Sequence, residues 1–508
     1  MTIRSTAWRL FFSAWLVYSL HWATDFSREH FLVLSIAEEG SFRLDKYADM
    51  HKDIFVLANG QAHHGANPGI SMIGAIPYAL LRPLVDRVVD GNVARRAGDT
   101  VSPSDYQDPR LARRLRYAQM RDRGLDLRFG LVGLITQVLA MAPLAAAGVV
   151  VFFLVLCGMG LPSRHALAGA VLYGFGTPAF YRAAYLNHNL AVGIFAFAGF
   201  WLLWNPGNRL SWSDNRRYVL AGLCGGMSVL LDYSGGIVLA ALAAYATLLV
   251  VRRGVGWAGV PHLTWRYAAG AIGPIMLVWF YQWVSFGHPF YPPQHYMPPV
   301  TWSDLGYQGV TGPQGELFWM LLLDARFGLF VLCPILLLGL LTPVIVRRSR
   351  VPIEWPEIIF ALGFTAAVIV FFSAVQYAHL QYIHGIRYLI PVIPFLTLLT
   401  VVFLLELPRW LSYLLGLLAI AFAWAQAMVR VNEQQSSILE PLCEVLLGGP
   451  RLPALTTLSR LPGQYFSEGA PLTPTTALLA AAALLWLIWS VRRPATSLAT
   501  DLPGTDGT

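Results

Sequence analysis

Long hydrophobic runs recur along almost the whole chain and constrain its fold more than any other feature. Most measure about 16 to 28 residues, and an α-helix of about 20 apolar residues crosses the roughly 30 Å hydrocarbon core of a bilayer. The strands of a membrane barrel would be much shorter. Only 13% of the 508 residues are charged, which agrees with this pattern. The sequence therefore predicts an all-α integral membrane protein.

About twelve of the runs are predicted to cross the membrane. They lie at residues 8–23, 130–157, 164–181, 188–204, 217–232, 235–251, 267–286, 326–346, 356–376, 388–406, 409–429 and 474–491. A further run, Ser71–Val85, is short and contains Pro77, so we expect a helix lying on the membrane surface. With that run left outside, the short arginine-bearing loops fall on the N-terminal side. The positive-inside rule then places both termini in the cytoplasm.

The chain divides into one large module and a short C-terminal addition. Residues 1–429 form the transmembrane module, with a first outer loop at 24–129 that holds short juxtamembrane helices. A proline- and aromatic-rich outer loop at 287–325 has the composition of an ordered lid. Residues 430–491 add another outer loop and the last membrane helix. The Ser/Thr/Gly-rich residues 492–508 are predicted to be a disordered cytoplasmic tail.

Reactive side chains gather at the outer ends of the predicted spans. The polar run Asp25–Gly69 follows the first span and concentrates carboxylates and imidazoles. Later outer ends add His188, Asp232, Arg326, His384 and Arg387. Such groups beside a membrane-spanning scaffold indicate an enzyme or a carrier that works at one membrane face. The formal net charge of +8 comes from arginines spread over short loops, which topology explains better than a nucleic-acid partner does.

Transfer of a group from a lipid phosphate suits this set of residues. Arginine forms bidentate hydrogen bonds to phosphate, and a carboxylate can take a proton from an incoming hydroxyl. Arg387 and Arg326 are the candidates for the first role, and Asp25 and Asp53 for the second. Asp25 stands where the first helix leaves the bilayer, and partial burial there raises the pKa of a carboxyl group. The remaining candidates for substrate contact are Arg28, His188, Asp232 and His384.

Structural interpretations of the same residues stay open. Asp25 and Asp232 also fit as polar groups at helix ends, and the arginines fit as side chains that reach toward lipid headgroups. His63 and His64 are adjacent and point apart on a helix or strand, and the four cysteines are scattered, so no metal site is predicted. Whether a divalent ion takes part is left open.

Several short strings occur in the order and spacing found in one family. They are Gly40–Asp45, Asn67–Gly69 with Ala75–Tyr78, Tyr185–Leu190, Leu231–Tyr233, Arg326–Phe330 with Cys333–Pro334, and Arg387–Pro391 with Pro394. From the first helix to Leu405 the chain resembles the GT-C superfamily of polytopic membrane glycosyltransferases. The similar branch holds the protein mannosyltransferases, the lipid A aminoarabinose transferase and the rhizobial lipopolysaccharide sugar transferases. Family members often carry an Asp-Lys pair where this chain has Gly65-Ala66.

The resemblance implies a GT-C-like helix bundle and an inverting glycosyltransferase of the plasma membrane. The donor would be a polyprenyl-phosphate-linked sugar, and the acceptor an envelope glycan, lipid or protein at the outer face. The catalytic acidic residue of the family lies near the end of the first helix, which corresponds to Asp25 and then to Asp53. The alternatives are a polysaccharide or lipid transporter and an inactive scaffold subunit of an envelope assembly. Carriers place charges near the bilayer midplane, whereas the charges of this chain cluster at one face.

Overall fold

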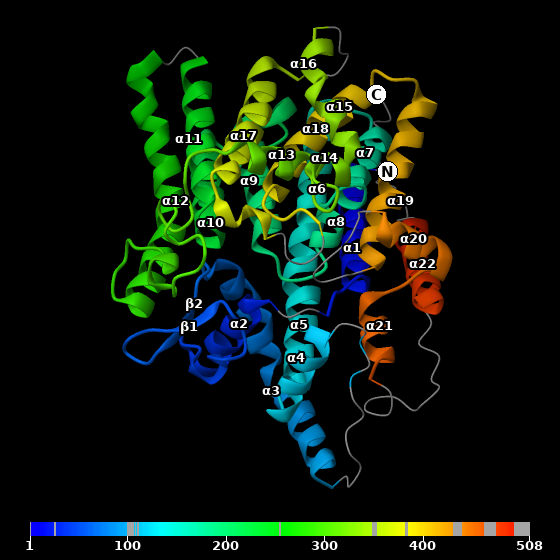
Figure 1. Cartoon of the computed structure of the whole chain (residues 1–508). Helices are drawn as coiled ribbons and strands as arrows, with labels where there is room; N and C mark the ends of the chain where they lie inside the picture. The colour runs from blue at the N-terminus through cyan, green and yellow to red at the C-terminus, as the bar shows by residue number, and fades with distance from the viewer. Residues whose placement is uncertain are drawn as a thin grey trace, which may run out of the picture.

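The fold was analysed in a computed structural model that describes residues 2–24, 27–98, 106, 108, 111–252, 256–347, 353–380, 385–429, 439–461 and 474–491. Figure 1 shows a large bundle of helices with a smaller layer attached to one end of it. The smaller layer comprises α2 (Arg28–Glu39), β1 (Ile54–Val56), β2 (Ala62–His64), α3 (Gly69–Gly98) and α4 (Leu111–Asp122). It corresponds to the first outer loop expected from the sequence.

The bundle is built from apolar helices, most of which contribute side chains to one buried core. Its longer helices are α1 (Ile3–Leu20), α6 (Ala142–Gly158), α7 (Ser163–Phe175), α9 (His188–Trp204), α10 (Asp214–Leu231), α11 (Gly235–Val250), α12 (Gly256–Phe286), α17 (Trp355–Ser373), α18 (Ile393–Leu404), α19 (Arg409–Met428) and α22 (Pro474–Ser490). Helix α10 packs against α9, α11 and α12, and α1 packs against α6. Gly222 and Gly226 allow this close packing, because a Cβ atom at either would overlap the backbone of α12.

Among the described residues, four helices are long and apolar enough to cross a membrane: Asp126–Gly158, Leu263–Phe286, Trp355–Ser373 and Arg409–Met428. Shorter apolar helices cover His188–Trp204, Gly235–Val250, Ile390–Leu404 and Pro474–Ser490. The first of the four joins α5 (Asp126–Thr136) to α6 through a π-helical turn at Gln137–Met141. The buried Gln137 amide there donates to the carbonyls of Tyr18 and Ala183. The predicted class, a helical membrane protein, agrees with this architecture.

Two of the predicted spans are not continuous helices. Residues 164–181 divide into α7 and the short α8 (Ala179–Arg182), because Gly176 ends the first piece and Pro178 cannot continue its hydrogen bonding. Residues 326–346 divide into α14 (Leu329–Leu332), α15 (Leu337–Leu340) and α16 (Thr342–Ile345). Pro334 and Pro343 lie at the starts of new short helical pieces there. In these two segments the hydrophobic runs predicted an apolar environment correctly, but they did not predict that each helix is divided into shorter pieces.

The smaller layer differs from the short surface helices that the sequence predicts. The expected helix at Ser71–Val85 is part of α3, which has 30 residues and contains Pro77 and Pro83. Helix α3 packs against α2 and α5, and in Figure 1 it runs away from the bundle and does not lie along it. Helix α2 begins after Ser27, whose N–H donates to His30 Nδ1, and ends at Gly40, which adopts φ 61°.

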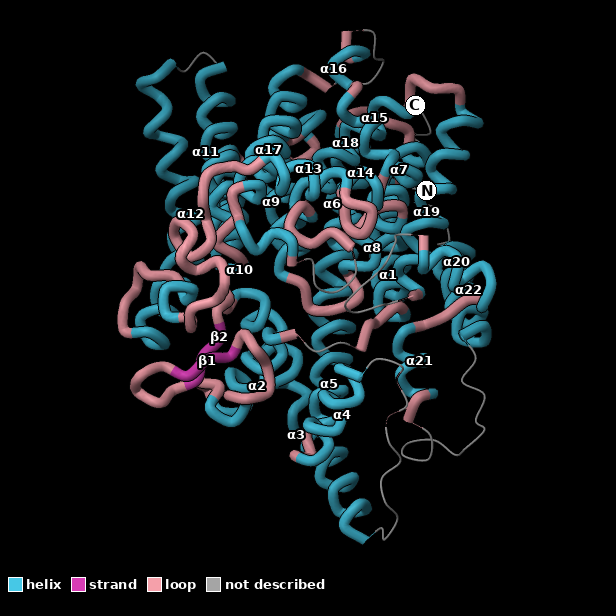
Figure 2. Tube along the Cα trace, viewed as in Figure 1, coloured by secondary structure: helices cyan, strands magenta, loops and turns pink. Residues whose placement is uncertain are grey.

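A two-stranded hairpin, which the sequence analysis did not predict, completes the smaller layer (Figure 2). Strands β1 and β2 pair antiparallel with Ile54 opposite His64 and Val56 opposite Ala62. The hydrogen bond from Gly65 N–H to the Asp53 carbonyl extends the ladder by one residue. Asp53 therefore lies beside His64 and Gly65, although these residues are 11 and 12 positions further along the sequence.

Candidate functional site

The first turn of α2 and the start of the hairpin form one ionic contact. Arg28 Nη1 lies 3.0 Å from Asp53 Oδ2, and Arg28 Nε lies 3.4 Å from Glu29 Oε1. Burial tends to raise the pKa of Asp53, but the positive charges of Arg28 and Arg387 lower it below its usual value. Asp53 is therefore ionised at neutral pH and fixes the Arg28 guanidinium in place.

Two histidines of the hairpin are held neutral beside this contact. His51 Nδ1 accepts the backbone N–H of Asp53 at 3.0 Å, and His64 Nδ1 accepts that of Ala66 at 3.0 Å. Burial lowers the pKa of His51 to about 4 and that of His64 to about 3. Both imidazoles therefore act as turn-stabilising acceptors at neutral pH and add no positive charge to the site.

His188, at the start of α9, bridges two carboxylates. Its Nδ1 lies 3.2 Å from Glu29 Oε1, and its Nε2 lies 3.6 Å from Asp232 Oδ2. The Asn189 amide nitrogen lies 3.1 Å from Nε2, which fits a tautomer with the proton on Nδ1, directed at Glu29. Asp232 follows the end of α10, and its Oδ1 accepts hydrogen bonds from the N–H and hydroxyl of Ser234.

Glu29 is the central residue that the sequence analysis did not select. It is buried and receives both Arg28 and His188. Burial tends to raise its pKa, but the hydrogen bond from His188 and the charge of Arg28 hold the pKa of Glu29 well below its usual value. An acidic residue in the first turn of a helix is common for reasons of helix stability, so its sequence position gave little signal.

Arg387 reaches the same place from the turn between α17 and α18. Its charge interacts with those of Arg28 and Glu29, and it contributes to the lowered pKa of Asp53. A buried arginine, Arg182, fixes the residues that precede it. Its guanidinium donates to the carbonyls of Ile386 at 2.8 Å and Gly385 at 2.6 Å and contacts the Tyr185 hydroxyl. Sequence reasoning also missed Arg182, because it is separated from this turn by about 200 residues.

The loop 287–325 lies against the hairpin and against the end of α17. The Gln294 side chain donates to the Gly65 carbonyl at 3.0 Å. A Cβ atom on Gly65 would come within 2.4 Å of Met297 Sδ, so the glycine permits this contact. Further along, Thr311 N–H donates to the Ala374 carbonyl at 2.8 Å. The predicted lid-like loop is therefore held at both the hairpin and the end of α17.

Of the residues predicted from sequence, the structure brings together Arg28, Asp53, His188, Asp232 and Arg387. With Glu29 they form what we call the ionisable cluster. Arg326 lies apart in an exposed turn, where Nη2 is 3.2 Å from Asp324 Oδ2. Asp25 and His384 lie outside the described residues. Within the described ranges, no group of three His, Cys, Asp or Glu side chains is arranged to hold a metal ion.

The fold and the cluster define a class: a helical protein with segments able to cross a membrane and with buried and half-buried ionisable groups gathered at one end of its bundle. Comparison of the chain with models of protein families, with characterised proteins and with solved structures gave no match.

Proposed function

We propose that the chain is a glycosyltransferase of the plasma membrane, which moves a sugar from a polyprenyl-phosphate donor to an outer-face glycan, lipid or protein acceptor. The observation that carries this proposal is the convergence of the ionisable cluster from five separate segments. They are the start of α2, the start of the hairpin, the start of α9, the end of α10 and the turn before α18. Burying ionisable groups costs free energy, so their concentration at one place is typical of a functional site.

Arg28 and Arg387 support the assignment of a phosphate-binding role. Each interacts with the charge of Asp53, and the two guanidiniums also repel each other. A phosphate oxygen between them would relieve this repulsion and accept several charge-assisted hydrogen bonds. Fixed cations at a departing phosphate stabilise the charge that develops there in the transition state. The lowered pKa of Asp53 suits the holding of these guanidiniums better than it suits proton abstraction.

His188 is the best-placed base among the described residues. Glu29 orients its ring through Nδ1, which leaves Nε2 on the side of Asp232 to take a proton. The acceptor oxygen bonds to the anomeric carbon while the bond from that carbon to the phosphate oxygen breaks. The electron pair leaves with the phosphate, the hydroxyl proton goes to the base, and the configuration inverts. Asp25 stays a second candidate for the base, on the sequence argument given above.

The test is reconstitution of the purified protein in vesicles with a panel of polyprenyl-phosphate sugars and lipid or glycan acceptors. The expected result is release of polyprenyl phosphate from at least one donor, with a loss of about 100-fold or more in His188→Gln. The thermal midpoint in detergent checks that the variant is folded. Transport of intact labelled donor without release of polyprenyl phosphate would instead identify a carrier. If the His188→Gln variant restored full function in cells that lack the wild-type protein, the chain would instead be identified as a scaffold.

A further inference from the structure

A cavity of about 620 Å³ lies between α7 and α19, away from the ionisable cluster. Helix α18 begins six residues after Arg387 of the cluster and ends at Leu404, which lines the cavity. The cavity is therefore separated from the cluster by the length of α18. Its wall is mostly apolar and includes Val171, Leu172, Val401, Leu404, Leu417 and Ile420.

The cavity is bordered by a helix face that is exposed in the fold. Helix α19 is one of the four helices able to cross a membrane, and Trp410, Leu414, Leu417 and Leu418 on it are all exposed. An exposed apolar face on such a helix suits contact with lipid chains. Water finds few hydrogen-bond partners in an apolar groove of this size. Transfer of a hydrocarbon chain from water into the groove is favourable.

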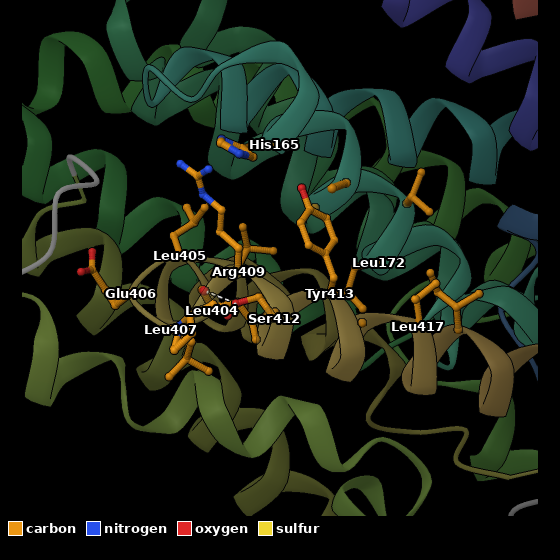
Figure 3. Close-up of a pocket in the computed structure, with 17 residues that line it drawn as sticks. His165, Leu172, Leu404, Leu405, Glu406, Leu407, Arg409, Ser412, Tyr413 and Leu417 are labelled. Atoms are coloured by element: carbon orange, nitrogen blue, oxygen red, sulfur yellow. Dashed lines mark hydrogen bonds between the residues drawn. The ribbon is translucent and has the colours of Figure 1, made fainter.

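The polar residues of the cavity gather at one end. In Figure 3, the side chains of His165 and Arg409 face each other, the Tyr413 hydroxyl points toward the same side, and Glu406 points away. The positive charges of Arg164 and Arg409 both act on His165. Ser412 donates its hydroxyl hydrogen to the Leu404 carbonyl at 2.6 Å, so it holds the first turn of α19. This end is cationic and complements an anionic group.

We propose that this cavity is a binding site for a glycerophospholipid of the adjoining leaflet, with an acyl chain in the apolar groove and the phosphate held by Arg409 and His165. A guanidinium at the start of a helix binds phosphate with both charge and directed hydrogen bonds. The apolar wall matches the acyl chain of a phospholipid, and the cationic end matches its phosphate headgroup. This proposal does not depend on the proposed function.

Native mass spectrometry of the detergent-purified protein tests the site with added phosphatidylglycerol, diacylglycerol and inorganic phosphate. Gly416 lines the cavity, and a Cβ atom there meets open space, so Gly416→Phe fills the groove without displacing the backbone. Gly363→Phe, on α17, is the matched control, because its Cβ atom also meets open space and it lies outside the cavity. Arg409→Gln removes the charge but leaves the groove unchanged. Thermal midpoints verify that all variants are folded.

The expected result is one phosphatidylglycerol retained by the wild-type protein and by Gly363→Phe, but lost from Gly416→Phe. Arg409→Gln should bind phosphatidylglycerol about 10-fold more weakly. Inorganic phosphate at millimolar concentration should not displace the lipid. Retention by a folded Gly416→Phe would overturn the proposal, as would equal binding of diacylglycerol and phosphatidylglycerol. Displacement by inorganic phosphate would assign the cationic end to a free anion and would also overturn it.

Discussion

At the scale of single residues, Glu29 distinguishes an organised site from a chance grouping of charges. Glu29 Oε1 lies 3.4 Å from Arg28 Nε and 3.2 Å from His188 Nδ1, and the residue is buried. Glu29→Gln keeps the side-chain volume but removes the charge that favours the Nδ1–H tautomer of His188. We expect kcat for polyprenyl-phosphate release to fall about 10² to 10⁴-fold, as for the loss of an oriented base, with KM nearly unchanged.

Two further variants test whether Glu29 orients the His188 ring or only stabilises the fold. Glu39→Gln, at the other end of α2, removes a carboxylate that pairs with the exposed Lys46, and its activity should match the wild type. Glu29→Asp restores the charge with a shorter reach and should recover part of the activity and the wild-type pH profile. Equal activity of Glu29→Gln and Glu39→Gln would show that His188 does not need Glu29.

Arg387 and Arg326 form a second residue-scale test, since both were predicted to bind phosphate and only Arg387 lies in the ionisable cluster. Arg387→Gln should weaken binding of polyprenyl phosphate about 10 to 100-fold, because a charged hydrogen bond contributes about 1.5 to 3 kcal/mol. Arg326→Gln should change it less than about twofold, because this arginine pairs with Asp324 in an exposed turn. Binding is measured by native mass spectrometry. Weaker binding by Arg326→Gln than by Arg387→Gln would contradict the assignment.

At the scale of elements, the β1–β2 hairpin should lose stability as the pH falls. The pKa values of His51 and His64 are lowered to about 4 and about 3. In the opened hairpin these histidines take up protons below about pH 6.5, whereas in the folded hairpin they do so only at lower pH. The stability of the hairpin therefore falls from about pH 6.5 downward, and the loss of stability is complete only below the folded pKa values. The cost is at most about 1.4 kcal/mol per histidine and pH unit. The lowered pKa of Asp53 adds a loss in the same direction at more acidic pH.

Hydrogen exchange of peptides covering 51–66 measures this effect. After correction for intrinsic rates, we expect opening of the hairpin to increase roughly 100-fold between pH 7.5 and pH 5.5, because each of the two histidines contributes about tenfold over the pH unit below 6.5. Both imidazoles accept a backbone N–H two residues on, and an asparagine Oδ1 can accept the same bond. The double variant His51→Asn, His64→Asn should therefore keep the hairpin and lose its pH dependence. An unchanged pH dependence in that variant would rule out these histidines as its cause.

The helices also show which parts of the fold could be predicted from the sequence. Apolar runs predicted the helical class, because the period and length of hydrophobic segments follow from the bilayer. They overestimated continuous helices at 164–181 and 326–346, where Pro178 and Pro334 break the backbone hydrogen bonding. Five cluster residues were selected as reactive groups at helix ends. Glu29 and Arg182 were not, because their partners are His188 and the carbonyls of residues 385 and 386, and such distant contacts exist only after folding.

At the scale of the whole molecule, the order of the helices separates the ionisable cluster from the loop between α9 and α10. Helix α9 leaves the cluster at His188 and has 17 residues, about 25 Å at 1.5 Å per residue, and α10 returns to Asp232. If the cluster is at the outer face, Ser211 between these helices faces the cytoplasm, whereas Asn59 at the hairpin tip faces outward. Both positions are exposed. Among the four cysteines only Cys443 is exposed, so Cys443→Ser provides the background for labelling.

Labelling with a membrane-impermeant maleimide in intact cells tests this arrangement. Asn59→Cys should react without permeabilisation, and Ser211→Cys only after it. Each is the control for the other, because the two variants differ only in which end of the bundle carries the thiol. The opposite pattern would place the ionisable cluster in the cytoplasm, where nucleotide-activated sugars are available. At a cytoplasmic site a nucleotide-activated sugar would be an available donor. That labelling pattern would therefore remove the topological reason for a polyprenyl-phosphate donor, while the geometry of the cluster would stay the same.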